Sequence, residues 1–160
     1  MHQIHLGRID DREVARLTDQ VRALSADLRR EAGADAGVAG DAVPEGVEAV
    51  LLARVAAGRP IVGPSTLGVG PEEYLLGLGD LTGEVRRLAL SALARGDLDS
   101  AEARLALLDE LFHTLMRFDA SRAVVPLKPK QDAARGIVER TRGDVVLARY
   151  LATASPRGRR

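Results

Sequence analysis

The chain contains no cysteine and no tryptophan, and only 2% of its 160 residues are aromatic. Without cysteine, disulfide bonds and thiolate metal sites are excluded. Strands favour β-branched and aromatic side chains, whereas alanine and leucine, which dominate this composition, favour helices. The sequence therefore predicts an all-α protein with an aliphatic core.

Long apolar runs are also missing. No stretch approaches the roughly 20 apolar residues that a membrane span needs, and the start MHQIHLGRIDD lacks the apolar segment of a signal peptide. We therefore expect a cytoplasmic protein with no membrane partner. With 46% apolar residues the chain can bury one core, so we expect a single domain over residues 1–154 and a disordered basic tail at 155–160.

The charges balance overall but are unevenly spread. The chain has 23 basic and 23 acidic residues, yet residues 119–160 hold ten basic against four acidic side chains. Almost all basic residues are arginine, which suits bidentate contacts to phosphate. GC-rich coding enriches arginine as well, so both explanations stay open.

Five segments have the apolar period of helices. Pro44 and Pro71 suit first helical turns, Gly96 suits a helix end, and Asp99 with Glu102 resembles a capping box. Gly136 and Gly143 would let a second helix come close. The segments predict an antiparallel bundle of five to six α-helices, with its main helices near residues 11–31, 44–58, 71–95, 99–118 and 129–152.

Two acidic pairs lie at helical spacing. Asp80 and Glu84 are one turn apart, and Glu45 and Glu48 are three residues apart, so each pair shares one helix face. Carboxylate oxygens are the ligands that Mg²⁺ and Mn²⁺ prefer, and two such helices could together hold one cation. The alternative is two ordinary solvated faces, since acidic residues near a helix start also complement its dipole.

Few residues of the chain are candidates for other kinds of enzyme chemistry. The glycines of TLGVGPEEY lack the lysine and spacing of a phosphate-binding loop. Glu110 and His113 form one E-x-x-H, whereas a di-iron bundle needs two. A nucleophilic triad cannot be assembled without cysteine and with isolated histidines, so metal-assisted hydrolysis is the one enzyme chemistry that these residues support.

A basic stripe follows the last predicted helix. Arg135, Arg142 and Arg149 recur every seven residues, and Arg87 continues the polar stripe of Asp80 and Glu84. We predict that these four arginines contact nucleic-acid phosphates. For the last helix a merely solvated face is an equal alternative.

Three stretches resemble the translin family, especially its translin-associated factor X branch as found in prokaryotes. EEYLLGLGDLTGEVRRLALSALARGDLDSAEARLALLDELF resembles the family's central helical pair, and KQDAARGIVERTRGDVVLA resembles its C-terminal helix. PEGVEAVLLA matches an earlier helix that carries Glu-x-x-Glu in that branch. The resemblance covers most of residues 44–149.

The resemblance implies an all-helical fold that assembles into closed octamers and binds single-stranded RNA or DNA inside them. It implies that Glu45, Glu48, Asp80 and Glu84 are catalytic and metal-binding residues of an endoribonuclease dependent on Mg²⁺ or Mn²⁺. We therefore predict a homo-oligomeric nucleic-acid-binding protein with this activity. The alternative is a nucleic-acid-binding helical oligomer without catalytic activity.

Overall fold

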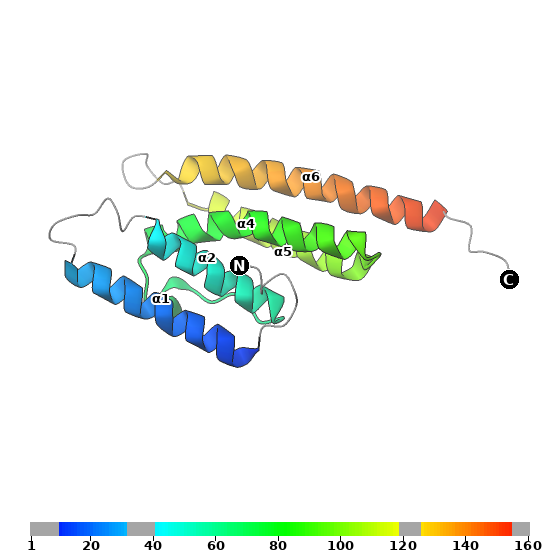
Figure 1. Ribbon diagram of the computed structural model, residues 1–160. Helices are drawn as coiled ribbons and strands as arrows, with labels where there is room; N and C mark the ends of the chain where they lie inside the picture. Colours follow the sequence, from blue (N-terminus) through cyan, green and yellow to red (C-terminus); the bar gives the residue numbers. More distant parts are fainter. Residues whose placement is uncertain (1–9, 32–40, 119–125, 155–160) are drawn as a thin grey trace. The chain divides into compact units, whose positions relative to one another are not determined.

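The computed structural model describes residues 10–31, 41–118 and 126–154, and over these residues it contains six α-helices and no strand (Figure 1). This confirms the predicted all-α class. In chain order the helices are α1 (Asp11–Glu31), α2 (Ala42–Ala56), α3 (Pro64–Leu67), α4 (Pro71–Ala94), α5 (Leu98–Met116) and α6 (Leu127–Ala154).

The chain divides into two compact units. The first contains α1, α2, α3, the part of α4 up to Leu81 and the start of α6 up to Lys130. The second contains the rest of α4, all of α5 and the rest of α6. The single domain over residues 1–154 stays a prediction, and the predicted tail at 155–160 lies outside the described residues.

The short helix α3 lies between the helices predicted near residues 44–58 and 71–95, where the sequence predicts no main helix. Pro64 occupies the start of this single turn, where a proline needs no hydrogen-bond partner. Gly68 ends the turn with φ +65°, in the left-handed region that favours glycine. Proline and glycine here form a turn of helix, rather than merely interrupting the chain.

In the first unit, α1 packs against α2 and α3 (Figure 1). Val14 and Val21 of α1 are buried. A Cβ on Gly46 would lie 2.9 Å from the side chain of Val21, so the missing side chain lets α1 and α2 come close. Helix α2 is buried along most of its length, as expected for an apolar helix inside a core.

Two glycines of α4 also admit neighbouring helices in this unit. A Cβ on Gly77 would lie 2.5 Å from the backbone oxygen of Pro44, and one on Gly79 would lie 2.8 Å from Lys130 Cβ. The close approaches predicted at Gly136 and Gly143 are wrong for the described residues. A Cβ on Gly143 would meet nothing within 4 Å, and the three atoms nearest to one on Gly136 all belong to Arg140 of α6 itself.

The second unit buries small and aliphatic side chains from α4, α5 and α6, such as Val85, Leu108 and Val138. Among its buried polar side chains is that of Gln131, whose amide group is hydrogen-bonded. Gln131 donates to the backbone oxygens of Leu115 and Phe118 at 2.9 and 2.8 Å. These bonds tie α6 to the end of α5.

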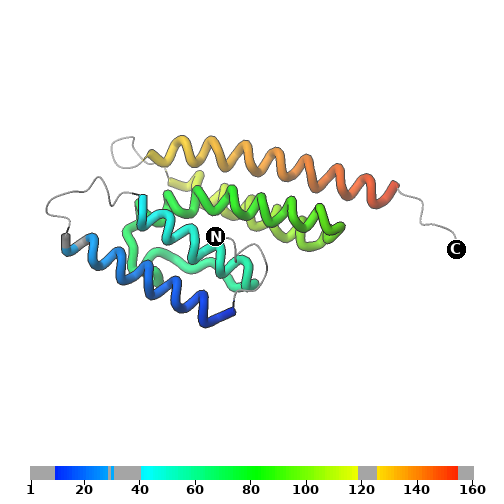
Figure 2. The backbone as a smooth tube through the Cα atoms, viewed as in Figure 1, coloured from blue at the N-terminus to red at the C-terminus, as the bar shows by residue number. Residues whose placement is uncertain are grey.

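The chain reverses sharply between α4 and α5 (Figure 2). Gly96 has φ +72°, and its N–H donates to Leu93 at 2.9 Å. The predicted helix end is therefore confirmed, but the predicted capping pair Asp99 and Glu102 is wrong. Asp97 follows the reversal directly and accepts a hydrogen bond from the Ser100 N–H at 3.0 Å, so it caps α5.

Candidate functional site

The first acidic pair lies at the start of α2. Glu45 is exposed and Glu48 is half-buried. Between them Val47 is fully buried, and it would be 2.8 Å from a Cβ on Gly77 of α4. The packing of Val47 against Gly77, which has no side chain, therefore fixes the positions of both glutamates in the first unit.

Asp80 of α4 is paired with a cation of the chain itself. Lys130 Nζ donates to Asp80 Oδ1, and both side chains are about one-third exposed, at 33% and 37%. The lysine stem passes over Gly79, where any side chain would displace it. Gly79 thus allows the first turn of α6 to bring a positive charge to Asp80.

Glu84 is the most buried of the four predicted ligands, with 8% of the residue exposed. Its Oε1 lies 3.3 Å from Nη2 of Arg87, three residues further along α4. Arg87 was predicted to contact nucleic acid, and its side chain is 61% exposed. It can stabilise the buried carboxylate and still present its charge to solvent.

The four carboxylates suit a hard divalent cation in the chemistry of their oxygen donors. Over the described parts of the chain, however, there is no group of three or more histidine, aspartate or glutamate side chains that could hold a metal ion. Lys130 already contacts Oδ1 of Asp80, and Arg87 lies near Oε1 of Glu84. The metal site therefore stays a prediction.

The predicted basic stripe of α6 lies in the second unit and is partly neutralised by α5. Arg142 Nη2 lies 2.6 Å from Asp109 Oδ1, and Arg149 Nε lies 3.5 Å from Glu102 Oε1. Arg135 is exposed. Exposed ion pairs contribute only about 0–1 kcal/mol, so phosphate groups could displace these carboxylates at small cost.

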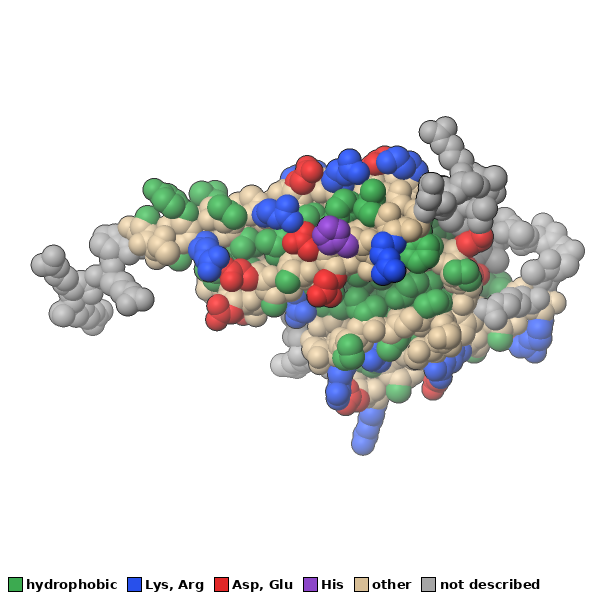
Figure 3. Space-filling model, turned by 180° about the vertical axis from the view of Figure 1, so that it is seen from behind, with side chains coloured by type: hydrophobic (Ala, Val, Ile, Leu, Met, Phe, Trp, Pro, Cys, Tyr) green, Lys and Arg blue, Asp and Glu red, His purple; other side chains and the backbone are tan. Residues whose placement is uncertain are grey.

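Acidic and basic side chains are interspersed over the face shown in Figure 3, rather than gathered into one basic patch. Glu110 and His113, the single E-x-x-H, are both exposed on α5. No helix within the described residues combines the length and apolar character required to cross a membrane.

Sequence reasoning missed Lys130 as a partner of the acidic residues. Fifty residues separate it from Asp80, and no local spacing connects two such positions.

Comparison with known proteins gives one family and several structures. The model of the translin family matches residues 14–141. The structure of AfC3PO with duplex RNA has a TM-score of 0.80 and 29% identity, covering 95% of this chain and 81% of that one. The crystal structure of AfC3PO has a TM-score of 0.78 and 30% identity, covering 92% and 79%.

Two further matches have lower sequence identity or cover less of the chain. The crystal structure of apo-NeC3PO, at 22% identity and a TM-score of 0.73, supports the fold alone; it covers 86% of this chain and 73% of that one. The uncharacterized protein MJ0175 of Methanocaldococcus jannaschii is 43% identical over 75 residues. That match spans 47% of this chain and about a third of the relative, at 34%.

Proposed function

Because the chain belongs to the translin family, we propose that it binds single-stranded RNA or DNA and cleaves RNA in the presence of Mg²⁺ or Mn²⁺. The observation that carries the binding proposal is the likeness over 95% of the chain to AfC3PO, whose structure includes duplex RNA. Duplex RNA is therefore tested beside single strands. A nucleic-acid-binding oligomer without catalytic activity is the competing proposal.

Arg135, Arg142 and Arg149 are the proposed phosphate contacts on α6, together with Arg87 on α4. Their side chains are exposed. Neutralising phosphates releases counterions from the nucleic acid, and this favours binding at low salt. Three of the four already hold a carboxylate oxygen at 2.6–3.5 Å, so a phosphate oxygen would replace a similar partner.

Glu45, Glu48, Asp80 and Glu84 are the proposed ligands of the divalent cation. When bound, the cation would supply neutralisation of the negative charge that develops as water attacks a phosphodiester. Before then Lys130 holds Asp80, and Arg87 lies beside Glu84. These two basic residues balance the negative charge of the two carboxylates and hold them in position.

We also propose a homo-oligomer, with the octamer as the size that the family resemblance implies. The last turns of α6 expose four large apolar side chains, Val146, Leu147, Tyr150 and Leu151, each more than half exposed, at 55–67%. Apolar patches of this kind are commonly covered by another subunit. Light scattering at micromolar concentration should find an oligomer, and a monomer would reject this part of the proposal.

The deciding experiment incubates the purified protein with labelled single-stranded and duplex RNA, with and without Mg²⁺ or Mn²⁺. Glu48→Gln and Glu84→Gln should lower metal-dependent cleavage at least about tenfold and leave most RNA binding intact. Glu110→Gln, on an exposed position of α5, should cleave like the native protein. It is a better control than Glu102 or Asp109, which hold Arg149 and Arg142.

The outcomes separate the two proposals. Full cleavage by the Glu48 and Glu84 variants would reject the assigned carboxylates. Binding without cleavage by any form would favour the non-catalytic binding protein. If the native protein binds neither single strands nor duplexes, both proposals fail.

A further inference from the structure

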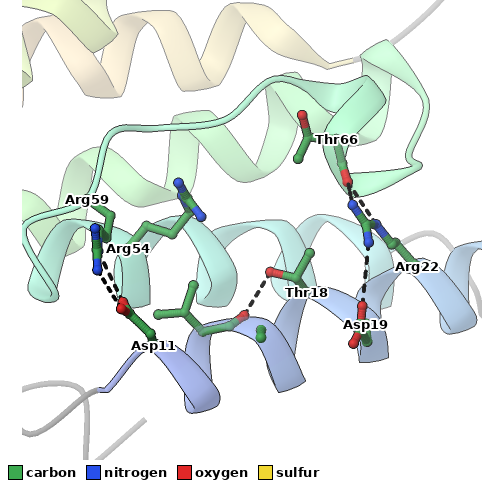
Figure 4. Close-up of a pocket in the computed structure, with 9 residues that line it drawn as sticks. Asp11, Thr18, Asp19, Arg22, Arg54, Arg59 and Thr66 are labelled. Carbon is green, nitrogen blue, oxygen red and sulfur yellow. Dashed lines mark hydrogen bonds and ion pairs between the residues drawn. The ribbon is translucent and has the colours of Figure 1, made fainter.

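A second candidate site lies in the first unit and is lined by none of the residues assigned above. It is a pocket of about 440 Å³ between α1, the end of α2 and α3. Figure 4 shows three arginines around it, Arg22 on α1, Arg54 on α2 and Arg59 just after α2. Its volume is within the range of small-molecule pockets, about 300–1,000 Å³.

Two of these arginines form hydrogen bonds and ion pairs with other residues that line the pocket. Arg59 donates two hydrogen bonds to the carboxylate of Asp11, the one from Nε at 3.0 Å (Figure 4). Arg22 donates from Nε to the backbone oxygen of Thr66 at 2.8 Å and has Asp19 at 3.4 Å. These bonds join α1 to the segment around α3, so the pocket is formed before any molecule enters it.

Arg54 is used differently. Its Nε donates to the backbone oxygen of Pro60 at 2.8 Å, and the residue is half-buried. A guanidinium carries five N–H donors, so this single bond leaves the donors of its two terminal nitrogens for a ligand, and Arg54 lines the pocket. Within the described ranges Arg54 has no ion pair, whereas Arg22 and Arg59 each have an aspartate.

The lining therefore carries three arginines against two aspartates, an excess of one positive charge. A planar guanidinium with both terminal nitrogens available matches two oxygens of a phosphate group. The pocket is much larger than a phosphate ion, and Val14 and Ala15 offer an apolar wall for an organic part. Thr18 and Thr66 add hydroxyl groups.

We propose that this pocket binds a phosphate monoester, with Arg54 holding the phosphate. The monoester could be a free mononucleotide or the 5′-terminal phosphate of an RNA. The two sources present the same dianion, but only the RNA continues beyond the first ribose. This proposal does not depend on the metal site or on RNA cleavage.

The test measures binding of inorganic phosphate, AMP and succinate to the full chain by calorimetry and by thermal melts. AMP should bind and raise the melting temperature. Arg54→Gln should weaken AMP binding at least about tenfold, the loss expected when a charged hydrogen bond is removed. Arg95→Gln, an exposed position that does not line the pocket, should bind AMP like the native protein.

Arg54→Lys is the second variant, because it keeps the charge and loses the planar pair of donors. It should also bind AMP more weakly, and it keeps the proposal testable if Arg54→Gln fails to fold. A 5′-phosphorylated oligoribonucleotide is compared with its 5′-hydroxyl form to separate the two sources. A preference for the phosphorylated end that is lost in both Arg54 variants would support the terminal-phosphate source.

Three results would overturn the proposal. One is the absence of binding by both AMP and the 5′-phosphorylated strand. Another is unchanged binding in the Arg54 variants. The third is succinate binding as tight as AMP binding, which would assign the pocket to carboxylates instead.

Discussion

Replacing Gly77 with alanine tests how closely α2 is held against α4 in the first unit. Alanine gains about 1 kcal/mol over glycine inside a helix. The new Cβ, however, would lie 2.5 Å from the Pro44 backbone oxygen and 2.8 Å from the buried Val47 side chain. Overpacking a core costs about 1–3 kcal/mol, and because a backbone atom cannot rotate away we expect the upper part of this range, about 2–3 kcal/mol. After the gain in helix propensity, the net destabilisation should be about 1–2 kcal/mol.

Gly83→Ala is the matched control on the same helix. Its Cβ would meet nothing within 4 Å among the described residues, so the variant should be more stable by about 0.5–1 kcal/mol. Urea denaturation followed by circular dichroism compares both variants with the native protein. If Gly77→Ala proves as stable as Gly83→Ala, the close contact between α2 and α4 is not what requires glycine at position 77.

Three other changes test separate contacts. The Ser100 hydrogen bond lowers the pKa of Asp97, so Asp97 stabilises the fold above the ordinary aspartate pKa and loses this effect as pH falls through its lowered folded-state pKa. In urea denaturation, Asp97→Ala should therefore lower the free energy of unfolding at neutral pH and lower it less in acid, whereas Asp97→Asn should keep the cap. An equal loss at both pH values would contradict this. Lys130→Met removes the ammonium from Asp80, so Mg²⁺ should raise its melting temperature more than that of the native protein; an equal or smaller rise would argue against a cation at Asp80. Charge reversal of Arg135 and Arg142 should weaken RNA binding about equally for all sequences and flatten its salt dependence in titrations, while unchanged affinity would place the RNA path elsewhere.

The helices could be predicted from the sequence because their signals are local. Apolar residues recur at helical spacing, and Pro71 and Gly96 bracket α4, which runs Pro71–Ala94. Leu78 and Val85, seven residues apart on α4, are buried at 1% and 0% exposure. The acidic and basic candidates were also visible as residue types at a given spacing, and the resemblance to the translin family followed from contiguous stretches.

The short-range signals failed where two of them competed. Asp97 and Asp99 both suit a helix start, and only the reversal at Gly96 decides that Asp97 is the cap. In the same way, Pro64 and Gly68 are compatible with an irregular loop and with the two ends of a single helical turn. The choice depends on backbone angles that the surrounding structure determines.

Tertiary structure alone decided which partners the charged and small residues have. Asp80 holds Lys130, fifty residues away, and Arg142 on α6 holds Asp109 on α5. Gly77 and Gly79 admit other helices, whereas a Cβ on Gly143 would meet nothing within 4 Å in the part of the chain that the structure describes. Sequence spacing determines which side chains share a helix face, but ion pairs and close contacts depend on distances between helices that are far apart along the chain.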